Sequence, residues 1–126
     1  MGDVIKVRLS EQIHLDQGRL NTLYAQLGET GAETVVCRAM EELAVRMAQC
    51  ETLWRANNRV QLRKHARSLI AISDQVGMQR LAQVARDVTD CVDAQDEIAT
   101  AATLSRLLRI GERSLSAIWS MDDLKI

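Results

Sequence analysis

Apolar residues recur at steps of three and four along most of the chain, the spacing that places side chains on one face of an α-helix. The pattern begins near Ile13 and continues, with a few interruptions, almost to the last residue. A chain with this pattern is expected to form a series of amphipathic helices. The successive stripes are Leu20, Leu23, Tyr24 and Leu27; Val36, Met40, Leu43, Met47, Cys50 and Trp54; Leu62, Ala66, Leu69, Ser73 and Val76; Leu81, Val84, Ala85, Val88, Cys91 and Val92; and Ala101, Leu104, Leu108, Leu115 and Ile118.

The interruptions consist of residues that begin or end helices. Gly28 follows the first stripe, as glycine does at a helix C-terminus. Thr30 and Glu33 then have the spacing of a capping box, in which each side chain satisfies a free backbone amide of the other residue. The remaining interruptions are Asn57-Asn58, Gly77 and the polar stretch 93–96, where the residue types favour turns.

All the predicted connections are short, so neighbouring helices are expected to run antiparallel. The predicted fold is all-α, an up-and-down antiparallel four-helix bundle with an additional short N-terminal helix or arm. We assign residues 1–12 to the arm and residues 13–126 to one helical bundle domain. Gly111 lies inside the last predicted helix and lowers its helix propensity by roughly 1 kcal/mol relative to Ala.

The composition supports this fold. The 126 residues include no Phe, no Pro, one Tyr and two Trp, while 47% of the residues are hydrophobic. The core is therefore expected to be aliphatic. β-Sandwiches and barrels use aromatic strands and Pro/Gly turns, so the composition argues against both.

Charge and cysteine content narrow the function classes further. The formal net charge is −1, which gives no general attraction to nucleic acid or to anionic membranes. No apolar run is long enough to span a membrane, and the N-terminus lacks the pattern of a signal peptide. Cys37, Cys50 and Cys91 are far apart and odd in number, which favours reduced thiols in a cytoplasmic protein. We expect no metal and no cofactor.

Common catalytic motifs are missing from the sequence. It contains no Gly-rich phosphate loop, no His-Glu-x-x-His pair and no nucleophile elbow, and its histidines are His14 and His65. The most informative stretch runs from Leu62 to Leu81. Its characteristic positions are Leu62, Ala66, Leu69, Ser73, Gly77 and Leu81.

This stretch resembles the signature of histidine-phosphotransfer (Hpt) domains, the four-helix-bundle relays of two-component signalling. In that family an Ala-His pair is followed by x-Leu-Lys-Gly, then by a small residue, a glycine and a leucine. The stretch from Ile13 to Gly28 is similar to the opening helix of the family, so the resemblance covers roughly residues 13–120. It implies a phosphorelay protein whose partners are a response-regulator receiver domain, a sensor kinase, or both.

The chain departs from the family at the reactive positions. Arg67 stands at the phosphoacceptor position, Ile70 replaces the family's lysine, and Ala71 replaces the neighbouring glycine. A guanidinium has no lone pair with which to attack phosphorus. Isoleucine supplies no positive charge for phosphoryl oxygens, and alanine adds a methyl group where a partner would approach. The resemblance therefore implies a domain that does not accept phosphate.

His65 is the alternative phosphoacceptor. On an ideal helix Arg67 lies about 140° from the centre of the apolar stripe, in solvent, whereas His65 lies about 60° from it on the opposite flank. His65 is thus expected to be a boundary histidine, partly covered by a neighbouring helix. A second hypothesis keeps it as the phosphate carrier of an active histidine phosphotransfer protein.

The third predicted helix also carries a basic patch. Arg63, Lys64 and Arg67 lie on its exposed face, and Arg80 and Arg86 are on the next helix. Such a patch is either an ordinary solvated face or a docking surface for the acidic phosphorylation pocket of a receiver domain. The predicted partner-binding residues are Arg63, Lys64, Arg67, Ile70, Ala71, Asp74 and Gly77. A third hypothesis is an unrelated helical adaptor or structural protein, because bundles host many functions.

Overall fold

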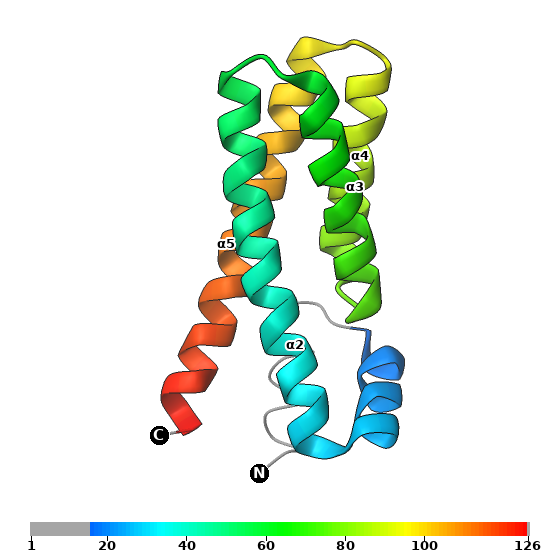
Figure 1. The fold of residues 1–126 in the computed structure, drawn as a ribbon, viewed down its shortest axis with the longest axis vertical. Helices are drawn as coiled ribbons and strands as arrows, with labels where there is room; N and C mark the ends of the chain where they lie inside the picture. The colour runs from blue at the N-terminus through cyan, green and yellow to red at the C-terminus, as the bar shows by residue number, and fades with distance from the viewer. Residues whose placement is uncertain (1–15, 126) are drawn as a thin grey trace.

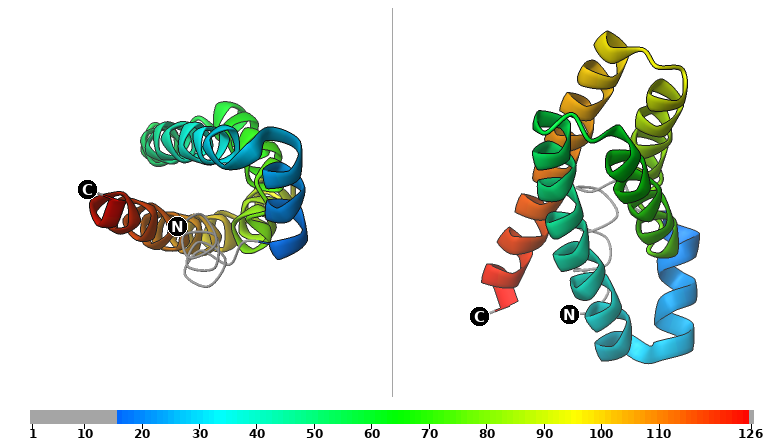
Figure 2. Two further views of the ribbon diagram at one scale, coloured as in Figure 1. Left: turned by 90° about the horizontal axis from the view of Figure 1, so that it is seen from below. Right: turned by 45° about the horizontal axis from the view of Figure 1, so that its top comes forward.

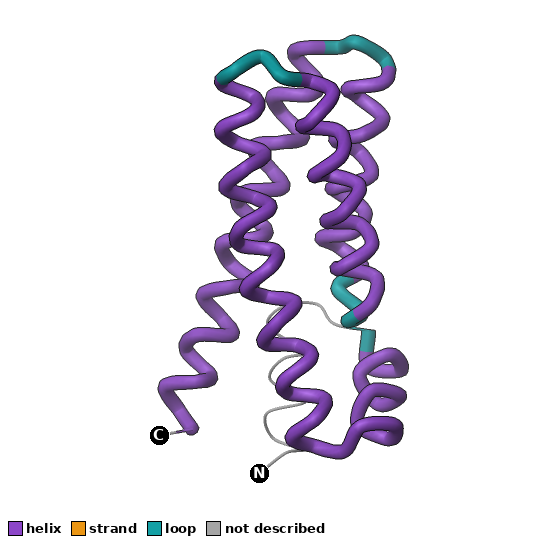
Figure 3. Tube along the Cα trace, viewed as in Figure 1, coloured by secondary structure: helices purple, strands orange, loops and turns teal. Residues whose placement is uncertain are grey.

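The computed structural model describes the backbone of residues 16–125 and the side chains of residue 16 and residues 18–116. The predicted arm, residues 1–12, and His14 lie outside the described residues. Within that range the chain forms helices joined by short turns and contains no strand (Figure 3). The helices are α2 (Gln17–Arg55), α3 (Arg59–Gln75), α4 (Gln79–Asp93) and α5 (Glu97–Lys125).

The helices form an up-and-down bundle, which confirms the predicted fold. Each helix runs antiparallel to the one before it, and α3 and α4 lie beside the upper parts of the longer α2 and α5 (Figure 1). Contacts join α2 to α3, α3 to α4 and α4 to α5, and α5 closes the ring by packing on α2. Below the level of α3 and α4, the long helices move apart (Figure 2).

Gly28 divides α2 into a short and a long part. It is the one residue within α2 with non-helical backbone angles, φ 73° and ψ 177°, and the chain changes direction there. The predicted helix end at Gly28 is therefore confirmed. The predicted capping box is wrong: the break falls two residues before Thr30, so Thr30 lies inside the helix, where its carbonyl accepts a hydrogen bond from Thr34 Oγ1 (2.9 Å).

The short part of α2 folds back beneath the α3–α4 turn (Figure 2). The Asp16 backbone N–H donates to the Gly77 carbonyl at 2.6 Å, and Asp16 Oδ2 accepts from Gln79 Nε2 at 2.8 Å. Arg19 Nε donates to the Gln75 carbonyl at 2.7 Å. Gly77 has φ +79°, and a Cβ there would lie 2.9 Å from Arg19 Cβ. Glycine therefore permits both the turn and the close approach of this segment.

The other predicted turns are also confirmed. Asn57 adopts φ +59°, and Asn58 caps α3 by accepting a hydrogen bond from the Gln61 N–H. At the α4–α5 turn Gln95 has φ +56°, and Asp96 Oδ1 accepts from the Ala99 N–H at 3.0 Å. Asparagine and aspartate hold these turns because their short side chains bond to nearby backbone amides.

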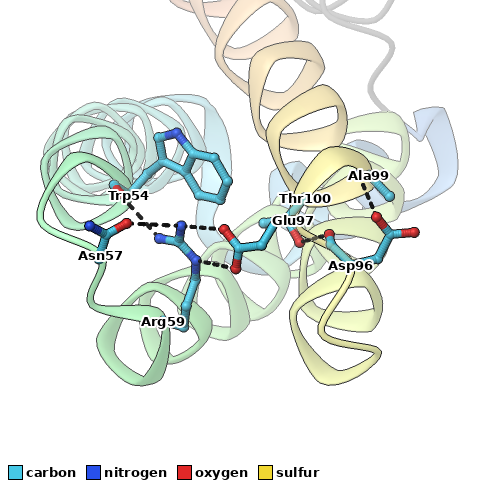
Figure 4. Close-up of polar contacts among 7 residues, drawn as sticks. All are labelled: Trp54, Asn57, Arg59, Asp96, Glu97, Ala99 and Thr100. Carbon is cyan, nitrogen blue, oxygen red and sulfur yellow. Dashed lines mark hydrogen bonds and ion pairs between the residues drawn. The ribbon is translucent and has the colours of Figure 1, made fainter.

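Around Arg59, polar contacts join three helix ends at the top of the bundle (Figure 4). Arg59 Nε and Nη2 donate to the two Glu97 carboxylate oxygens at 3.0 and 2.6 Å, which ties the start of α3 to the start of α5. The same guanidinium lies 3.8 Å from the ring centre of Trp54 and donates to the Trp54 carbonyl. The bidentate geometry and the stacking are both favourable for arginine in particular.

The core is aliphatic, as predicted. The predicted α3 stripe is buried throughout, and Leu62, Ala66 and Leu69 are each 0% exposed. Ser73 is also 0% exposed, and its Oγ has no hydrogen-bond partner among the described residues. Its small size, rather than its hydroxyl group, therefore suits the position.

Two predicted apolar positions are wrong. Leu27 is 47% exposed, because the chain turns directly after it at Gly28. Ala101 is exposed, and the neighbouring Thr100 is buried instead. Thr100 can be buried because its Oγ1 donates to the Asp96 carbonyl at 2.7 Å, which satisfies the hydroxyl group. Ile118 and Trp119 lie outside the described side chains.

Gly111 has a packing role that its helix propensity does not suggest. A Cβ at this position would lie 2.0 Å from Met47 Sδ and 2.6 Å from Met47 Cε. The missing side chain lets the Met47 thioether of α2 lie directly against the α5 backbone. The low helix propensity of Gly111 is therefore compensated by close packing between α2 and α5.

We predict that Gly111→Ala destabilises the protein by about 1–3 kcal/mol, because overpacking against Met47 outweighs the gain of roughly 1 kcal/mol in helix propensity. In a Met47→Ala background the same change should become neutral or stabilising. Urea unfolding of the wild type and the three variants measures this double-mutant cycle. If Gly111→Ala stabilises the otherwise wild-type protein, the packing role is wrong.

Candidate functional site

Arg67 lies near the middle of α3 with its side chain exposed. The buried stripe on the opposite side of the helix, which includes the neighbouring Ala66 and Leu69, fixes this orientation. Arg67 forms no hydrogen bond or ion pair within residues 16–116 whose side chains are described. It therefore presents an unpaired guanidinium to solvent; the helical periodicity predicts the exposure of Arg67 but not its lack of an ion-pair partner among the described residues.

Most of the other predicted partner-binding residues share this face. Lys64, Ala71 and Asp74 are exposed, and Arg63 and Ile70 are partly exposed. Gly77 is different: it is buried beneath Asp16 and Arg19 at the end of α3, so a partner cannot reach it. We define the docking face as the remaining six residues, which are Arg63, Lys64, Arg67, Ile70, Ala71 and Asp74.

Two ion pairs with α4 neutralise one charge of each sign on the docking face. Arg63 Nε and Nη2 donate to the Asp93 carboxylate oxygens at 2.6 and 3.1 Å. At the other end of the face, Arg86 Nη2 lies 2.7 Å from Asp74 Oδ2. The hydrogen bonds from Arg63, together with the charges of Arg63 and Arg67, lower the pKa of Asp93. Because Arg63 and Asp74 are each paired with a residue of α4, Lys64 and Arg67 are the charges of the face that form no ion pair with the other described residues.

His65 lies on the other flank of α3, half-buried against α2. Arg46 Nη1 is 3.1 Å from His65 Nδ1. A guanidinium can only donate, so Nδ1 is the acceptor and the neutral ring carries its proton on Nε2. Burial lowers the pKa of His65, and the positive charge of Arg46 lowers it further. The predicted boundary position of this histidine is confirmed.

The surface beside His65 is hollowed, but it is separate from the docking face. A depression of about 510 Å³ lies along α2 next to the histidine. Two arginines and two glutamates line it, so their formal charges cancel. The lining residues are Arg38, Glu41, Glu42, Val45, Arg46, Gln49 and His65.

The cysteines offer no reactive thiol of obvious function. None of the three, all of which lie among the described residues, forms a disulfide, and burial raises the pKa of Cys50 to about 11, which keeps its thiol protonated at neutral pH. Within the described part of the chain, no three His, Cys, Asp or Glu side chains form a group that could hold a metal ion. None of the described helices is long and apolar enough to cross a membrane.

Comparison of the chain with known protein families, with curated proteins and with solved structures finds no match. The resemblance to Hpt domains that the sequence suggests therefore remains a prediction based on the spacing of residues in the stretches Ile13–Gly28 and Leu62–Leu81.

We predict that His65 makes the protein less stable in mild acid. A folded-state pKa below the unfolded value means that the unfolded chain binds the proton more tightly. The contribution of neutral His65 is complete above the unfolded pKa of about 6.5 and is lost as the pH falls through that value towards the lower folded pKa. Unfolding free energies between pH 5 and about pH 8, compared for the wild type and His65→Gln, measure the effect.

The variant should show a weaker pH dependence than the wild type in this range. An NMR titration should also place the His65 pKa higher in Arg46→Gln than in the wild type. An unchanged titration curve in Arg46→Gln would show that the Arg46 contact does not influence the histidine.

Proposed function

We propose that this chain is an Hpt-like docking module that binds response-regulator receiver domains through the docking face of α3 without accepting phosphate. The observation that carries the proposal is the exposed, unpaired Arg67 guanidinium in the middle of α3. It stands at the position where the resemblance expects the reactive histidine. The four-helix bundle around it is of the architecture that the resemblance implies.

The chemistry of the face suits an acidic partner. The resemblance implies a receiver domain whose phosphorylation pocket is lined by carboxylates. The guanidinium of Arg67 can form charge-assisted, bidentate hydrogen bonds with such a carboxylate, and Lys64 adds a second positive charge one turn away. Ala71, exposed one turn beyond Arg67, leaves room for a partner's backbone with only one methyl group in the way. Binding without transfer would make the protein a competitor or a scaffold in a phosphorelay.

Loss of phosphate transfer follows from the same residues. Arg67 has no nucleophilic lone pair, and Ile70 offers no charge to a phosphoryl group. His65 does not replace them in this arrangement, because Arg46 occupies Nδ1 and the proton resides on Nε2. A ring nitrogen can attack phosphorus only if its lone pair is available, that is, if it carries no proton and accepts no hydrogen bond. His65 also lies on the α2 flank of α3, away from the docking face.

Binding to purified receiver domains from the same organism, with and without phosphorylation, tests the proposal by isothermal calorimetry. We expect at least one receiver to bind, and Arg67→Glu to weaken that binding about tenfold or more, because the reversed charge repels the acidic pocket. Arg106→Glu is the matched control: it makes the same change in net charge at an exposed position of α5 and should leave the affinity unchanged.

The same receivers, phosphorylated, distinguish the phosphocarrier alternative. We expect no acid-labile, alkali-stable phosphate on the wild-type chain after incubation. Label that appears on the wild type and disappears in His65→Ala would instead establish His65 as the carrier. Failure of every receiver to bind would contradict the proposed function and favour an unrelated helical adaptor.

A further inference from the structure

A second hollow lies at the upper end of the bundle, between the first turns of α3 and the α4–α5 turn. It encloses about 550 Å³. Its walls come from three helices whose ends meet there, so the surface is assembled only in the folded bundle. The lining residues are Arg59, Val60, Arg63, Lys64, Val92, Asp93, Gln95 and Glu97; the name upper hollow refers to this set.

Two bidentate ion pairs hold the walls of the upper hollow in place. The Arg59 guanidinium donates two hydrogen bonds, of 3.0 and 2.6 Å, to the Glu97 carboxylate. The Arg63 guanidinium donates two, of 2.6 and 3.1 Å, to the Asp93 carboxylate. Arg59 is also stacked on Trp54 (Figure 4). A surface that is already fixed loses little conformational freedom when it binds a ligand, which favours affinity.

The upper hollow has one unpaired charge. Its lining includes three cations and two anions, and the pairs Arg59–Glu97 and Arg63–Asp93 consume all but Lys64. Lys64 is exposed and forms no ion pair with the other described residues. The positive end of the α3 helix dipole lies on the same side. A carboxylate is a group whose negative charge complements the unpaired Lys64 ammonium.

Apolar side chains are exposed at the same end. Val60 lies within the upper hollow and is 68% exposed, and Ile98, directly after Glu97, is 85% exposed. Of the large apolar residues described, these two are the most exposed. Val92 adds a half-buried apolar side chain to the lining. Val60 is therefore the exposed apolar side chain of the upper hollow, and Val92, which also packs against the core, offers a second apolar surface in its lining.

We infer that the upper hollow binds a short acidic segment of a partner protein, in which one aliphatic side chain is flanked by carboxylates. The aliphatic side chain would enter between Val60 and Val92, and a flanking carboxylate would pair with the Lys64 ammonium. Recognition of this kind depends only on the lining of the hollow and holds for any partner with such a segment. It does not require that the chain bind receiver domains.

Acetylated and amidated pentapeptides test this inference by NMR titration of the ¹⁵N-labelled full chain. The probe is Asp-Glu-Leu-Asp-Glu, and the controls are Asp-Glu-Ala-Asp-Glu and Lys-Lys-Leu-Lys-Lys. We expect saturable shifts of the amides lining the upper hollow, with the probe binding at a Kd of about 1 mM. Each control peptide should bind about tenfold more weakly or not at all.

Matched protein variants separate this site from general charge attraction. Lys64→Glu should weaken probe binding about tenfold. Arg38→Glu makes the same change in charge on α2, outside the upper hollow, and should not weaken binding. Val60→Ser should weaken the leucine probe and leave the alanine control unchanged. The inference is overturned if the probe causes no saturable shift, if the basic peptide binds equally well, or if the two charge reversals have the same effect.

Discussion

The burial of one stripe of α3 is the constraint on which the rest of the structure depends. Leu62, Ala66 and Leu69 are wholly buried, and a helix turns by about 100° per residue, so the direction of every other α3 side chain is then fixed. Arg67 must face solvent and His65 must lie against α2. Rotating α3 to exchange them would bury an unpaired guanidinium, which costs several kcal/mol.

Ion pairs determine which of the exposed α3 side chains have charges available to a partner. The α3 surface is rich in cations, but Arg59 and Arg63 are committed to carboxylates beyond the helix, and Asp74 is committed to Arg86. Exposed ion pairs of this kind add little to stability. Their main effect is to hold side chains in place, which leaves Lys64 and Arg67 as the charges available to a partner. The docking face and the upper hollow share Arg63 and Lys64, so the two surfaces adjoin.

Most features set by local sequence are predictable, although the Thr30–Glu33 capping box was not, and features set by distant contacts are not predictable from periodicity. The glycine and asparagine turns and the α3 stripe depend on neighbouring residues, and the structure confirms them. The Arg63–Asp93 pair joins residues 30 positions apart, and the Arg46–His65 contact joins residues 19 positions apart, so periodicity alone cannot reveal either. Helix propensity predicts that Gly111 weakens α5. Only the structure shows that Met47 occupies the space that a side chain at this position would take. A polar residue such as Thr100 is expected to be exposed at the start of α5. In the structure its hydroxyl group donates to the Asp96 carbonyl, and this hydrogen bond allows Thr100 to be buried.

The most direct test of the proposed docking face is to map where a bound receiver domain touches the chain. Cross-saturation NMR from an unlabelled receiver to the deuterated, ¹⁵N-labelled chain identifies the amides at the interface. We expect the signals that lose intensity to cluster around Lys64, Arg67 and Ala71 on the docking face. An interface centred on the hollow that contains His65 and Arg46, on the opposite flank of α3, would contradict this assignment.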